Sequence, residues 1–189
     1  MGKIVISENI TLDGVIQDPT GEDGLQRGGW FSGIDDTDRA AWAKAEFEEA
    51  AGAAALLMGR RSYEYFVARG WESRTGAWAD RLRALPKYVV SSKLEDLEWT
   101  NTTVLRGDVL TEVAKLKERI DGDLVVYASG QLVPTLMEHD LVDELRLMTF
   151  PYIVGAGKRL FAETSELKTL RLAATRPIGA GIVLLTYLT

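Results

Sequence analysis

The sequence predicts an α/β protein with a mixed, mainly parallel central sheet, flanking helices and an antiparallel hairpin at its C-terminal end. Two observations lead to this prediction. Short apolar runs alternate with helical patterns over residues 53–139, which is typical of a parallel sheet. Three β-rich segments then follow at residues 141–150, 169–175 and 181–188, without the same alternation. A parallel sheet that receives antiparallel strands at one side explains this change of pattern.

The N-terminal part of the chain begins with a strand and a long loop. β-Branched residues predict a strand over residues 3–7. A Gly-rich and acidic stretch over residues 18–33 predicts a mobile loop beside a site, because long loops in compact domains are often functional. A helix is expected over residues 36–51, with Asp35 or Asp36 as its N-cap.

The middle of the chain predicts strands and helices in turn. Strands are expected at residues 53–58, 87–91, 102–105 and 124–127, and helices at residues 59–68, 76–84, 109–120 and 131–139. No linker, internal repeat or low-complexity tract interrupts this order. A single domain over residues 1–189 is therefore expected.

Composition excludes several classes of protein. The formal net charge of −6 argues against general affinity for nucleic acid or an anionic membrane, because both require a basic surface. The absence of cysteine excludes disulfides, thiolate nucleophiles and Cys-ligated metals. The chain opens directly into an apolar alternating run, and no stretch approaches the roughly 18 apolar residues of a membrane helix. We therefore expect a cytoplasmic location.

Three strand-to-helix junctions share a composition suited to phosphate. They lie at residues 58–62, 90–93 and 127–131. Gly59 and Gly130 leave out the side chain that would hold a phosphate away from the backbone, and free N–H groups at a helix start favour an anion. Arg60, Arg61 and Lys93 add positive charge. The alternative is that the glycines only form tight turns and the cations are solvated surface residues.

Several short motifs follow one another in an order that is more specific than any one of them alone. They are Thr11-Leu12-Asp13-Gly14-Val15, Leu57-Met58-Gly59-Arg60-Arg61-Ser62-Tyr63-Glu64, Lys87-Tyr88-Val89-Val90-Ser91-Ser92, Gly130-Gln131-Leu132, Leu141-Val142-Asp143-Glu144-Leu145 and Gly155-Ala156-Gly157-Lys158-Arg159-Leu160-Phe161. Over essentially the whole chain this order resembles the dihydrofolate reductase superfamily. The most similar branch is the one related to the reductase (C-terminal) domain of bifunctional riboflavin biosynthesis proteins. The resemblance implies the dihydrofolate-reductase-like version of the fold predicted above.

The resemblance also implies NADPH as the cofactor and assigns residues to it. The residues expected near its phosphates are Gly59, Arg60 and Arg61. Those expected near the adenosine ribose and its 2′-phosphate are Ser91, Ser92 and Lys93. The pyrophosphate is expected on Ala128, Ser129, Gly130, Gln131 and Leu132. The nicotinamide and substrate side is expected along Thr11, Leu12, Asp13, Gly14 and Val15.

The sequence departs from the superfamily pattern at two places. The last phosphate turn usually has two adjacent glycines, but here it contains Ala128-Ser129-Gly130; an alanine costs little there if its φ stays negative. Folate reductases carry a carboxylate in the first long helix, whereas residues 41–45 contain no acid. Reduction of dihydrofolate itself is therefore not expected, and Asp13 is our candidate for the catalytic proton donor or substrate anchor.

Aromatic and metal-ligating residues outside the junctions have simpler interpretations. Trp30 and Phe31 follow Gly28-Gly29, and either cover the substrate side as a lid or anchor the loop to the body. Trp71, Trp78 and Trp99 are expected to be packing residues. His139 is the only histidine and is expected to end a helix, and the acidic run at residues 35–38 is explained by helix capping. No metal site is expected.

Together these observations predict an NADPH-dependent reductase that transfers a hydride to a small, flat, pterin- or pyrimidine-like heteroaromatic compound or to a carbonyl compound. The alternative is a non-catalytic nucleotide- or ligand-binding protein of the same fold. The partner is a small molecule, with no nucleic acid and no membrane. The apolar C-terminal strands would leave sheet surface exposed, so a homodimer is expected as well.

Overall fold

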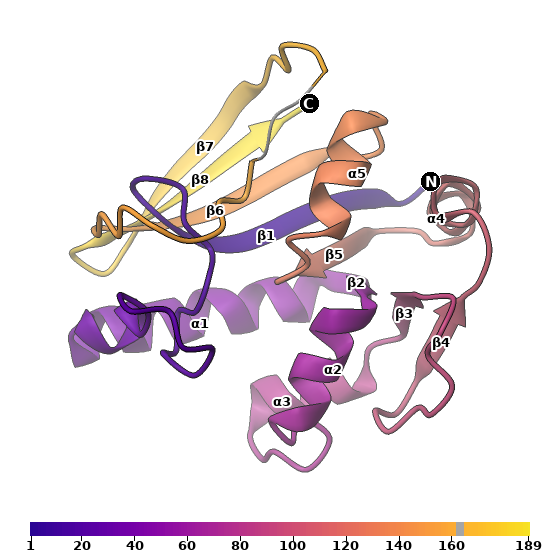
Figure 1. The fold of residues 1–189 in the computed structure, drawn as a ribbon, viewed down its shortest axis with the longest axis horizontal. Coiled ribbons are helices and arrows are strands. Elements are labelled where there is room, and N and C mark those ends of the chain that lie inside the picture. The colour runs from indigo at the N-terminus through magenta and orange to yellow at the C-terminus, as the bar shows by residue number, and fades with distance from the viewer. Residues whose placement is uncertain (162–164) are drawn as a thin grey trace.

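The computed structural model describes residues 1–161 and 165–189, and these residues form eight strands and five α-helices (Figure 1). The strands are β1 (Lys3–Thr11), β2 (Ala53–Gly59), β3 (Lys87–Val90), β4 (Thr102–Leu105), β5 (Asp123–Tyr127), β6 (Glu144–Phe150), β7 (Arg171–Ile178) and β8 (Ile182–Leu188). The helices are α1 (Asp36–Gly52), α2 (Arg60–Ala68), α3 (Ala77–Ala84), α4 (Val109–Arg119) and α5 (Leu132–Glu138). Among the helices of the described residues, none has both the length and the apolar character that a membrane span requires.

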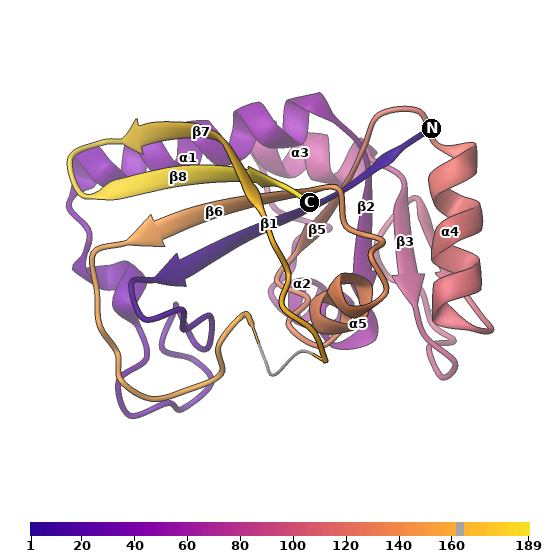
Figure 2. The same ribbon diagram turned by 90° about the horizontal axis from the view of Figure 1, so that it is seen from above.

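All eight strands belong to one sheet, with the order β4-β3-β2-β5-β1-β6-β8-β7. Every pairing from β4 to β6 is parallel, whereas β8 is antiparallel to both β6 and β7. Figure 2 shows β8 running against β6 at this side of the sheet. The predicted fold class, a mainly parallel sheet that ends in an antiparallel hairpin, is confirmed.

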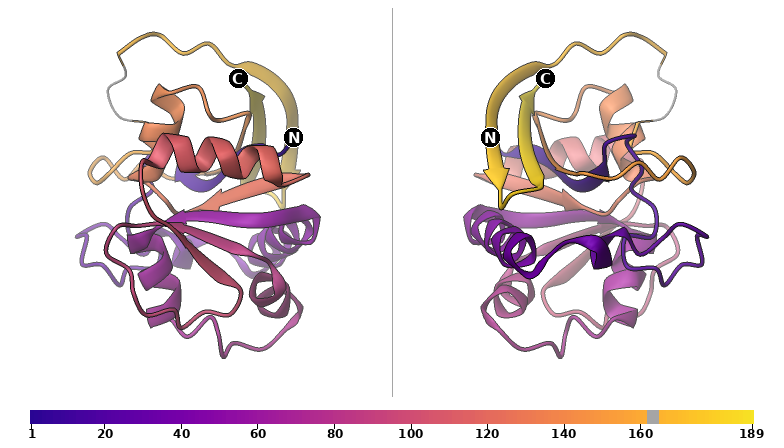
Figure 3. Two further views of the ribbon diagram at one scale, coloured as in Figure 1. Left: turned by 90° about the vertical axis from the view of Figure 1, so that its right-hand side faces the viewer. Right: turned by 90° about the vertical axis from the view of Figure 1, so that its left-hand side faces the viewer.

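The sheet is covered on both faces by helices, as the apolar strands require (Figures 1 and 3). α4 and α5 pack on one face, where Ile4 and Ile6 of β1 point. α1, α2 and α3 pack on the other face, where Val5 points. Because successive side chains of a strand alternate between faces, a single strand supplies both cores.

The turn between β7 and β8 is fastened to the start of α1 by Asp38. Its carboxylate accepts hydrogen bonds from the backbone N–H groups of Ala180 (2.6 Å) and Gly181 (3.0 Å). Asp35 caps α1 by accepting from the N–H of Asp38 (2.7 Å). The acidic run at residues 35–38 therefore caps backbone N–H groups, and in the described part of the chain no group of three acidic, His or Cys side chains is placed to hold a metal.

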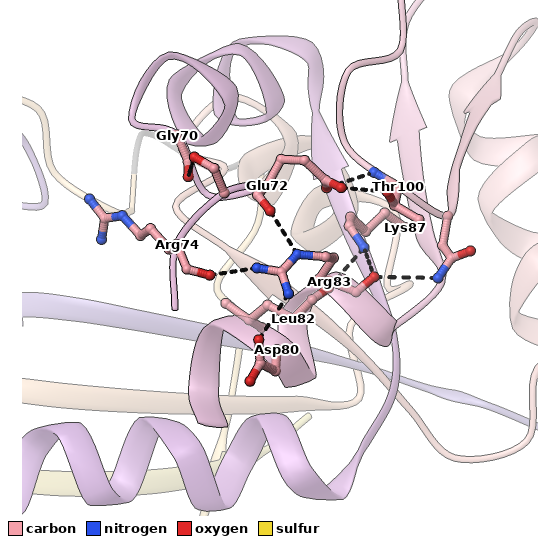
Figure 4. Close-up of polar contacts among 10 residues, drawn as sticks. Gly70, Glu72, Arg74, Asp80, Leu82, Arg83, Lys87 and Thr100 are labelled. Carbon is pink, nitrogen blue, oxygen red and sulfur yellow. Dashed lines mark hydrogen bonds and ion pairs between the residues drawn. The ribbon is translucent and has the colours of Figure 1, made fainter. Parts of the chain in front are cut away.

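A buried cation closes the corner between α3 and β3 (Figure 4). Lys87 is fully buried, and its ammonium donates to the carbonyl oxygens of Leu82 (2.8 Å), Arg83 (3.0 Å) and Leu85 (2.7 Å). These are carbonyls that the end of a helix leaves without an intrahelical partner. The ammonium also lies 4.8 Å from the centre of the Trp99 ring. Lys87 therefore ends α3 and joins it to the sheet.

The predicted elements agree with the structure to within a few residues at most boundaries. The difference that affects the site is the C-terminal end of β1. The sequence places its end at residue 7, whereas the strand continues to Thr11 alongside β6. The added residues bring Glu8 into the sheet.

Candidate active site

The three predicted phosphate junctions lie side by side at one edge of the sheet. The junctions after β2 and β5 lead into α2 and α5 as predicted, but the one after β3 leads into the loop before β4 and not into a helix. β3, β2 and β5 are neighbours and parallel, so their C-terminal ends meet at the same edge. The junctions line one groove of about 770 Å³. The lining includes every residue expected to contact the cofactor, namely Gly59, Arg60, Arg61, Ser91, Ser92, Lys93, Ala128, Ser129, Gly130, Gln131 and Leu132.

Two serines connect the β2 and β5 junctions. The Ser62 hydroxyl donates to the carbonyl oxygen of Ala128 (2.6 Å) and lies 3.1 Å from the Ser129 hydroxyl. The Ser129 hydroxyl accepts from the N–H of Gly59 (3.2 Å) and donates to the carbonyl oxygen of Tyr127 (3.0 Å). Because Ser129 is only 2 % exposed and its hydroxyl is engaged internally, this residue offers its backbone to the groove. The two serines hold the wall of the groove in place.

The last junction contains a strained backbone. Ala128 has a φ of +49°, in the left-handed region that non-glycine residues seldom adopt. The condition under which an alanine would cost little here, a negative φ, is therefore not met. The physical reason is the sharp turn by which the chain leaves β5, and it costs an alanine roughly 1–2 kcal/mol. The usual glycine at this position would avoid that cost.

The two glycines of the groove have different surroundings. Gly59 has an ordinary φ of −78°, and a Cβ added to it would lie 3.9 Å from the Cβ of Leu132. A Cβ added to Gly130 would lie 2.8 Å from the Ile16 side chain, which would have to move. Gly59 therefore has no conformational need to be glycine, whereas Gly130 permits a close approach of the loop.

Positive charge gathers around the groove, but not all of it is available. The Arg60 guanidinium forms an ion pair with Glu64 of the same helix (2.7 Å). Arg61, Lys93 and Lys158 also line the groove, and their side chains form no ion pair with any residue that the structure describes. The Ser91 hydroxyl accepts from the N–H groups of Lys93 (3.1 Å) and Leu94 (3.0 Å), which fixes the turn that carries Lys93.

The residues predicted for the substrate side do not line this groove. Thr11 is buried, and its hydroxyl donates to Asp13 (2.6 Å) and accepts from the N–H of Val15 (3.0 Å). Leu12 is 64 % exposed, Gly14 occupies a turn with a φ of +79°, and Val15 is buried in the core. The groove wall instead begins one residue later. It is formed by Ile16, Gln17, Asp18 and Pro19.

Asp13 has contacts that suit an anchor better than a proton donor. Its carboxylate accepts from the N–H groups of Val154 (3.2 Å) and Gly155 (2.8 Å) as well as from Thr11. These hydrogen bonds, with that from Thr11 the largest, lower the pKa of Asp13 to about 2. The carboxylate therefore holds the loop after β6 against the loop after β1, and it has no proton to give near neutral pH.

Trp30 and Phe31 belong to an aromatic cluster and not to the groove. Trp30 is 6 % exposed, and its indole N–H donates to the carbonyl oxygen of Gln17 (3.2 Å). The rings of both residues lie within about 5 Å of the Phe150 ring, at 5.2 Å for Trp30 and 5.1 Å for Phe31. These contacts match the anchor interpretation, because they tie the long loop to the end of β6, and they contradict the lid interpretation for Trp30.

Glu8 is a buried acid in the groove that the sequence interpretation missed. It lies on β1, is 9 % exposed and lines the groove together with the junction residues. Its Oε2 atom has no hydrogen-bond partner among the described residues, and burial raises the pKa of its carboxyl to about 8. The alternation of Ile4, Ile6 and Ile10 could have revealed it, because position 8 continues the same face.

Other residues singled out from the sequence lie where they were expected. Trp71 and Trp99 are buried in the core beneath α2 and α3, and Trp78 packs against it. His139 is the C-cap residue of α5 and is exposed.

Comparison with known proteins identifies the family of this fold and groove. The family model described as the RibD C-terminal domain matches residues 2–184. The chain belongs to the RibD C-terminal domain family. A curated relative is the uncharacterized protein YyaP of Bacillus subtilis (strain 168), which is 28 % identical over 136 residues, covering 70 % of this chain and 72 % of YyaP.

Solved structures show the same fold at low identity. A putative riboflavin biosynthesis protein from Shewanella sp. PV-4 has a TM-score of 0.72 at 17 % identity, with 98 % of each chain covered. Dihydrofolate reductase from Enterococcus faecalis, complexed with NADP(H), has a TM-score of 0.57 at 14 % identity, with 98 % of this chain and 95 % of that chain covered. The resemblance to the riboflavin-pathway branch of the dihydrofolate reductase superfamily is confirmed, and this member of the RibD C-terminal domain family has a reductase fold.

Proposed function

We propose that the protein is an NADPH-dependent reductase that transfers a hydride to a small, flat heteroaromatic or carbonyl compound. The observation that carries the proposal is the convergence on one groove of the turns after three parallel strands, of which those after β2 and β5 lead into helices. Ligands of open α/β sheets bind at the carboxyl ends of the strands, and nucleotide phosphates favour glycine turns and helix starts. The dihydrofolate reductase of the same fold, which was solved with NADP(H), supports this cofactor.

The residues of the groove fit a phosphorylated dinucleotide. Gly59 and Gly130 would admit the pyrophosphate close to the backbone. The guanidinium of Arg61, which forms no ion pair with any described residue, would bind its oxygens. Ser92 and Lys93 are exposed at the end of β3 and would contact the 2′-phosphate. Ile16 and Leu132 supply apolar surface for a flat ring.

The cofactor would supply the hydride, and the protein would supply binding and orientation. In this proposal Asp13 is not the proton donor, although the sequence made it a candidate for that role. Its two backbone hydrogen bonds to residues 154–155 hold the two loops that flank the substrate side. We assign it to positioning those loops.

The first test is cofactor binding. Tryptophan fluorescence, from the five tryptophans of the chain, is expected to report saturation by NADPH at a lower concentration than by NADH. Lys93→Ala should weaken NADPH about tenfold and NADH much less, because a charge-assisted contact to phosphate is worth about 1.5–3 kcal/mol. Lys44→Ala, on the exposed side of α1, is the matched control. Failure of both cofactors to bind below roughly millimolar concentration would refute the proposal.

Gly59→Ala tests whether the cofactor passes over the β2 junction. The backbone of Gly59 accepts any residue, and the added methyl group meets Leu132 at ordinary contact distance. The free energy of unfolding should therefore change by less than about 1 kcal/mol. NADPH affinity should fall about tenfold, because the methyl group stands where a phosphate would approach. Unchanged NADPH affinity would show that the pyrophosphate does not lie close to Gly59.

A ligand-binding protein without turnover is the second candidate. The strained Ala128 turn favours it, since the pattern of the superfamily has glycine at this position. Cofactor binding without any NADPH oxidation across pterins, pyrimidinones and quinones would support this candidate. Sustained turnover with any of them would exclude it.

We also propose a homodimer, which the exposed strand β7 supports. β7 forms one edge of the sheet, and its residues from Arg171 to Pro177 are exposed, with Leu172 at 50 %. Unpaired edges that carry apolar side chains favour association. Light scattering at micromolar concentration should give twice the mass of one chain, and a monomeric mass would contradict the proposal.

A further inference from the structure

β1 continues beyond the end of its neighbour β5, and this leaves an opening in the sheet. The ladder between β1 and β5 ends at the pair Ser7–Tyr127. The ladder between β1 and β6 continues to the pair Thr11–Phe150. From Glu8 onward, one side of β1 therefore faces the turn of residues 128–131 instead of a strand. The groove reaches β1 at this opening.

Glu8 is the residue that β1 presents at the opening. It lies on the same face as Ile4 and Ile6, whose side chains are in the core beneath α4 and α5, and it is itself more than nine-tenths buried. Glu8 is one of the residues that line the groove, and its buried Oε2 atom has no hydrogen-bond partner among the described residues. A buried polar atom without a partner costs about 1–3 kcal/mol. A bound ligand would remove that cost.

The groups around Glu8 keep its carboxyl neutral. Lys158 lines the same groove but forms no ion pair with it, and the carboxylate of Asp18 is engaged by the N–H groups of Asp23 and Leu25, at 2.9 Å each. From α1, the buried Glu46 adds an acid and not a cation. With burial as the dominant cause, the pKa of Glu8 is raised to about 8. A neutral carboxyl in such a place can donate a hydrogen bond at pH 7.

We propose that Glu8 is the acid of the active site, which donates a hydrogen bond to the substrate heteroatom and delivers the proton that completes its reduction. This inference rests on the proposed reductase function. It identifies the substrate class more narrowly, as a compound whose C=N or C=O bond offers its nitrogen or oxygen to a neutral acid.

The carbon of the C=N or C=O bond would accept a hydride, with both electrons, from the dihydronicotinamide, which would thereby be oxidised. The π pair of that bond moves to the nitrogen or oxygen and forms a new bond to the proton of Glu8. The Glu8 carboxylate then takes a proton from water, and the groove provides the route to solvent.

Glu46 provides a matched control because it is also a buried acid with a raised pKa, but it lies outside the groove. It is also fully buried, and burial raises its pKa to about 8. It lies on α1, beyond the other face of β1, where its carboxyl accepts from the Asn9 amide (3.3 Å). It does not line the groove. Replacing either acid by glutamine keeps a neutral side chain of the same shape.

The experiment compares the wild type, Glu8→Gln and Glu46→Gln. In the protein alone at pH 7, infrared spectra should show a protonated carboxyl band that disappears in Glu8→Gln, and this band should shift when 7,8-dihydropterin binds. NADPH affinity should stay within about threefold in all three proteins. With NADPH and either 7,8-dihydropterin or menadione, the single-turnover rate should fall 10²–10⁴-fold in Glu8→Gln only, the usual range for loss of a general acid. In the wild type the rate should decline above pH 8.

Two results would overturn the inference. One is a Glu8 carboxyl that is ionised at pH 7 or whose band is unchanged by bound pterin. The other is a Glu8→Gln variant that reduces the probes as fast as Glu46→Gln. Failure of the reductase proposal itself gives a different result, because wild-type protein would then bind neither NADPH nor NADH. The infrared spectrum of the protein alone would still show whether Glu8 is a neutral acid.

Discussion

Lys87 and Glu8 are both buried ionisable side chains, but they differ in the hydrogen-bond partners that the fold gives them. Lys87 closes the corner between α3 and β3, and its ammonium donates to three backbone carbonyls. Glu8 lies at the opening beside β5, and one of its carboxyl oxygens has no partner within the described residues. Burial is the largest cause of the pKa shift in both, which brings each to about 8. The two groups therefore have similar pKa values, although the ammonium of Lys87 has hydrogen-bond partners and the Oε2 atom of Glu8 has none among the described residues.

The difference teaches that partners, more than pKa, distinguish a structural group from a functional one. The partners of Lys87 are intrinsic to the fold, since the end of α3 needs donors for its carbonyls. Within the residues that the structure describes, the Oε2 atom of Glu8 has no such partner, so this atom is available to a ligand in the groove. The groove also contains the strained Ala128, and strain that the fold maintains tends to occur at functional sites.

Lys87→Met should produce the largest effect on stability. The variant removes the donor of the Leu82 and Leu85 carbonyls, while the Arg83 carbonyl keeps the Asn101 amide (3.3 Å), so the free energy of unfolding should fall by about 3–5 kcal/mol. Urea denaturation measures the change, and Lys93→Met at the exposed groove is the control, with a change within about 0.5 kcal/mol. The folded fraction of Lys87→Met should still bind NADPH. A loss of stability below about 1 kcal/mol would show that the three hydrogen bonds do not secure the corner.

The pH dependence of stability should divide the acids from the lysine. A pKa raised in the folded state means that the folded chain binds more protons between pH 4.5 and 8, so Glu8 and Glu46 make stability fall with pH in that window. The lowered pKa of Lys87 means that the unfolded chain binds more protons between pH 8 and 10.5, so stability should rise there. Each group contributes a slope of at most about 1.4 kcal/mol per pH unit.

Glu46→Gln isolates one of these contributions. Relative to the wild type, it should gain roughly 3–4 kcal/mol of unfolding free energy between pH 5 and pH 8, because glutamine cannot ionise. Thermal or urea denaturation at the two pH values measures the gain. An equal difference from the wild type at both pH values would show that Glu46 does not change protonation in this window.

Much of the fold follows from local patterns that the sequence displays openly. The apolar run at residues 53–58 and the glycine after it predict β2 and its turn, and the change to β-rich segments after residue 140 predicts the antiparallel side of the sheet. The phosphate junctions could be predicted because each combines a strand end with small residues, and two of the three add a cation. Their convergence follows from the parallel order of β3, β2 and β5.

The remaining features depend on contacts between distant parts of the chain. β1 extends past residue 7 because β6 supplies a partner up to Thr11. The alternation of Ile4, Ile6 and Ile10 continues across Glu8, but it does not show that β6 is the partner strand. Asp13 is a plausible proton donor by position, yet its pKa is lowered most by the Thr11 hydroxyl and further by the N–H groups of residues 154–155, which only the folded chain brings near. The sequence alone does not show that Lys87 is buried, because the carbonyls that accept from its ammonium lie at the end of α3.

Ala128→Gly should have the smallest effect, and its sign would sharpen the comparison between the groove and the corner. The alanine has a φ of +49° and is exposed, so its methyl group gives up no core packing when it is removed. Relief of the left-handed conformation is worth roughly 1–2 kcal/mol, and the added freedom of the unfolded chain offsets about 0.4–1 kcal/mol of it. The variant should therefore be more stable by about 0.5–1 kcal/mol in urea denaturation. Ala173→Gly, on exposed β7, is the control and should be destabilising. If Ala128→Gly is instead destabilised, the methyl group would contribute to holding the turn, and the groove would be as firmly built at this point as the corner around Lys87.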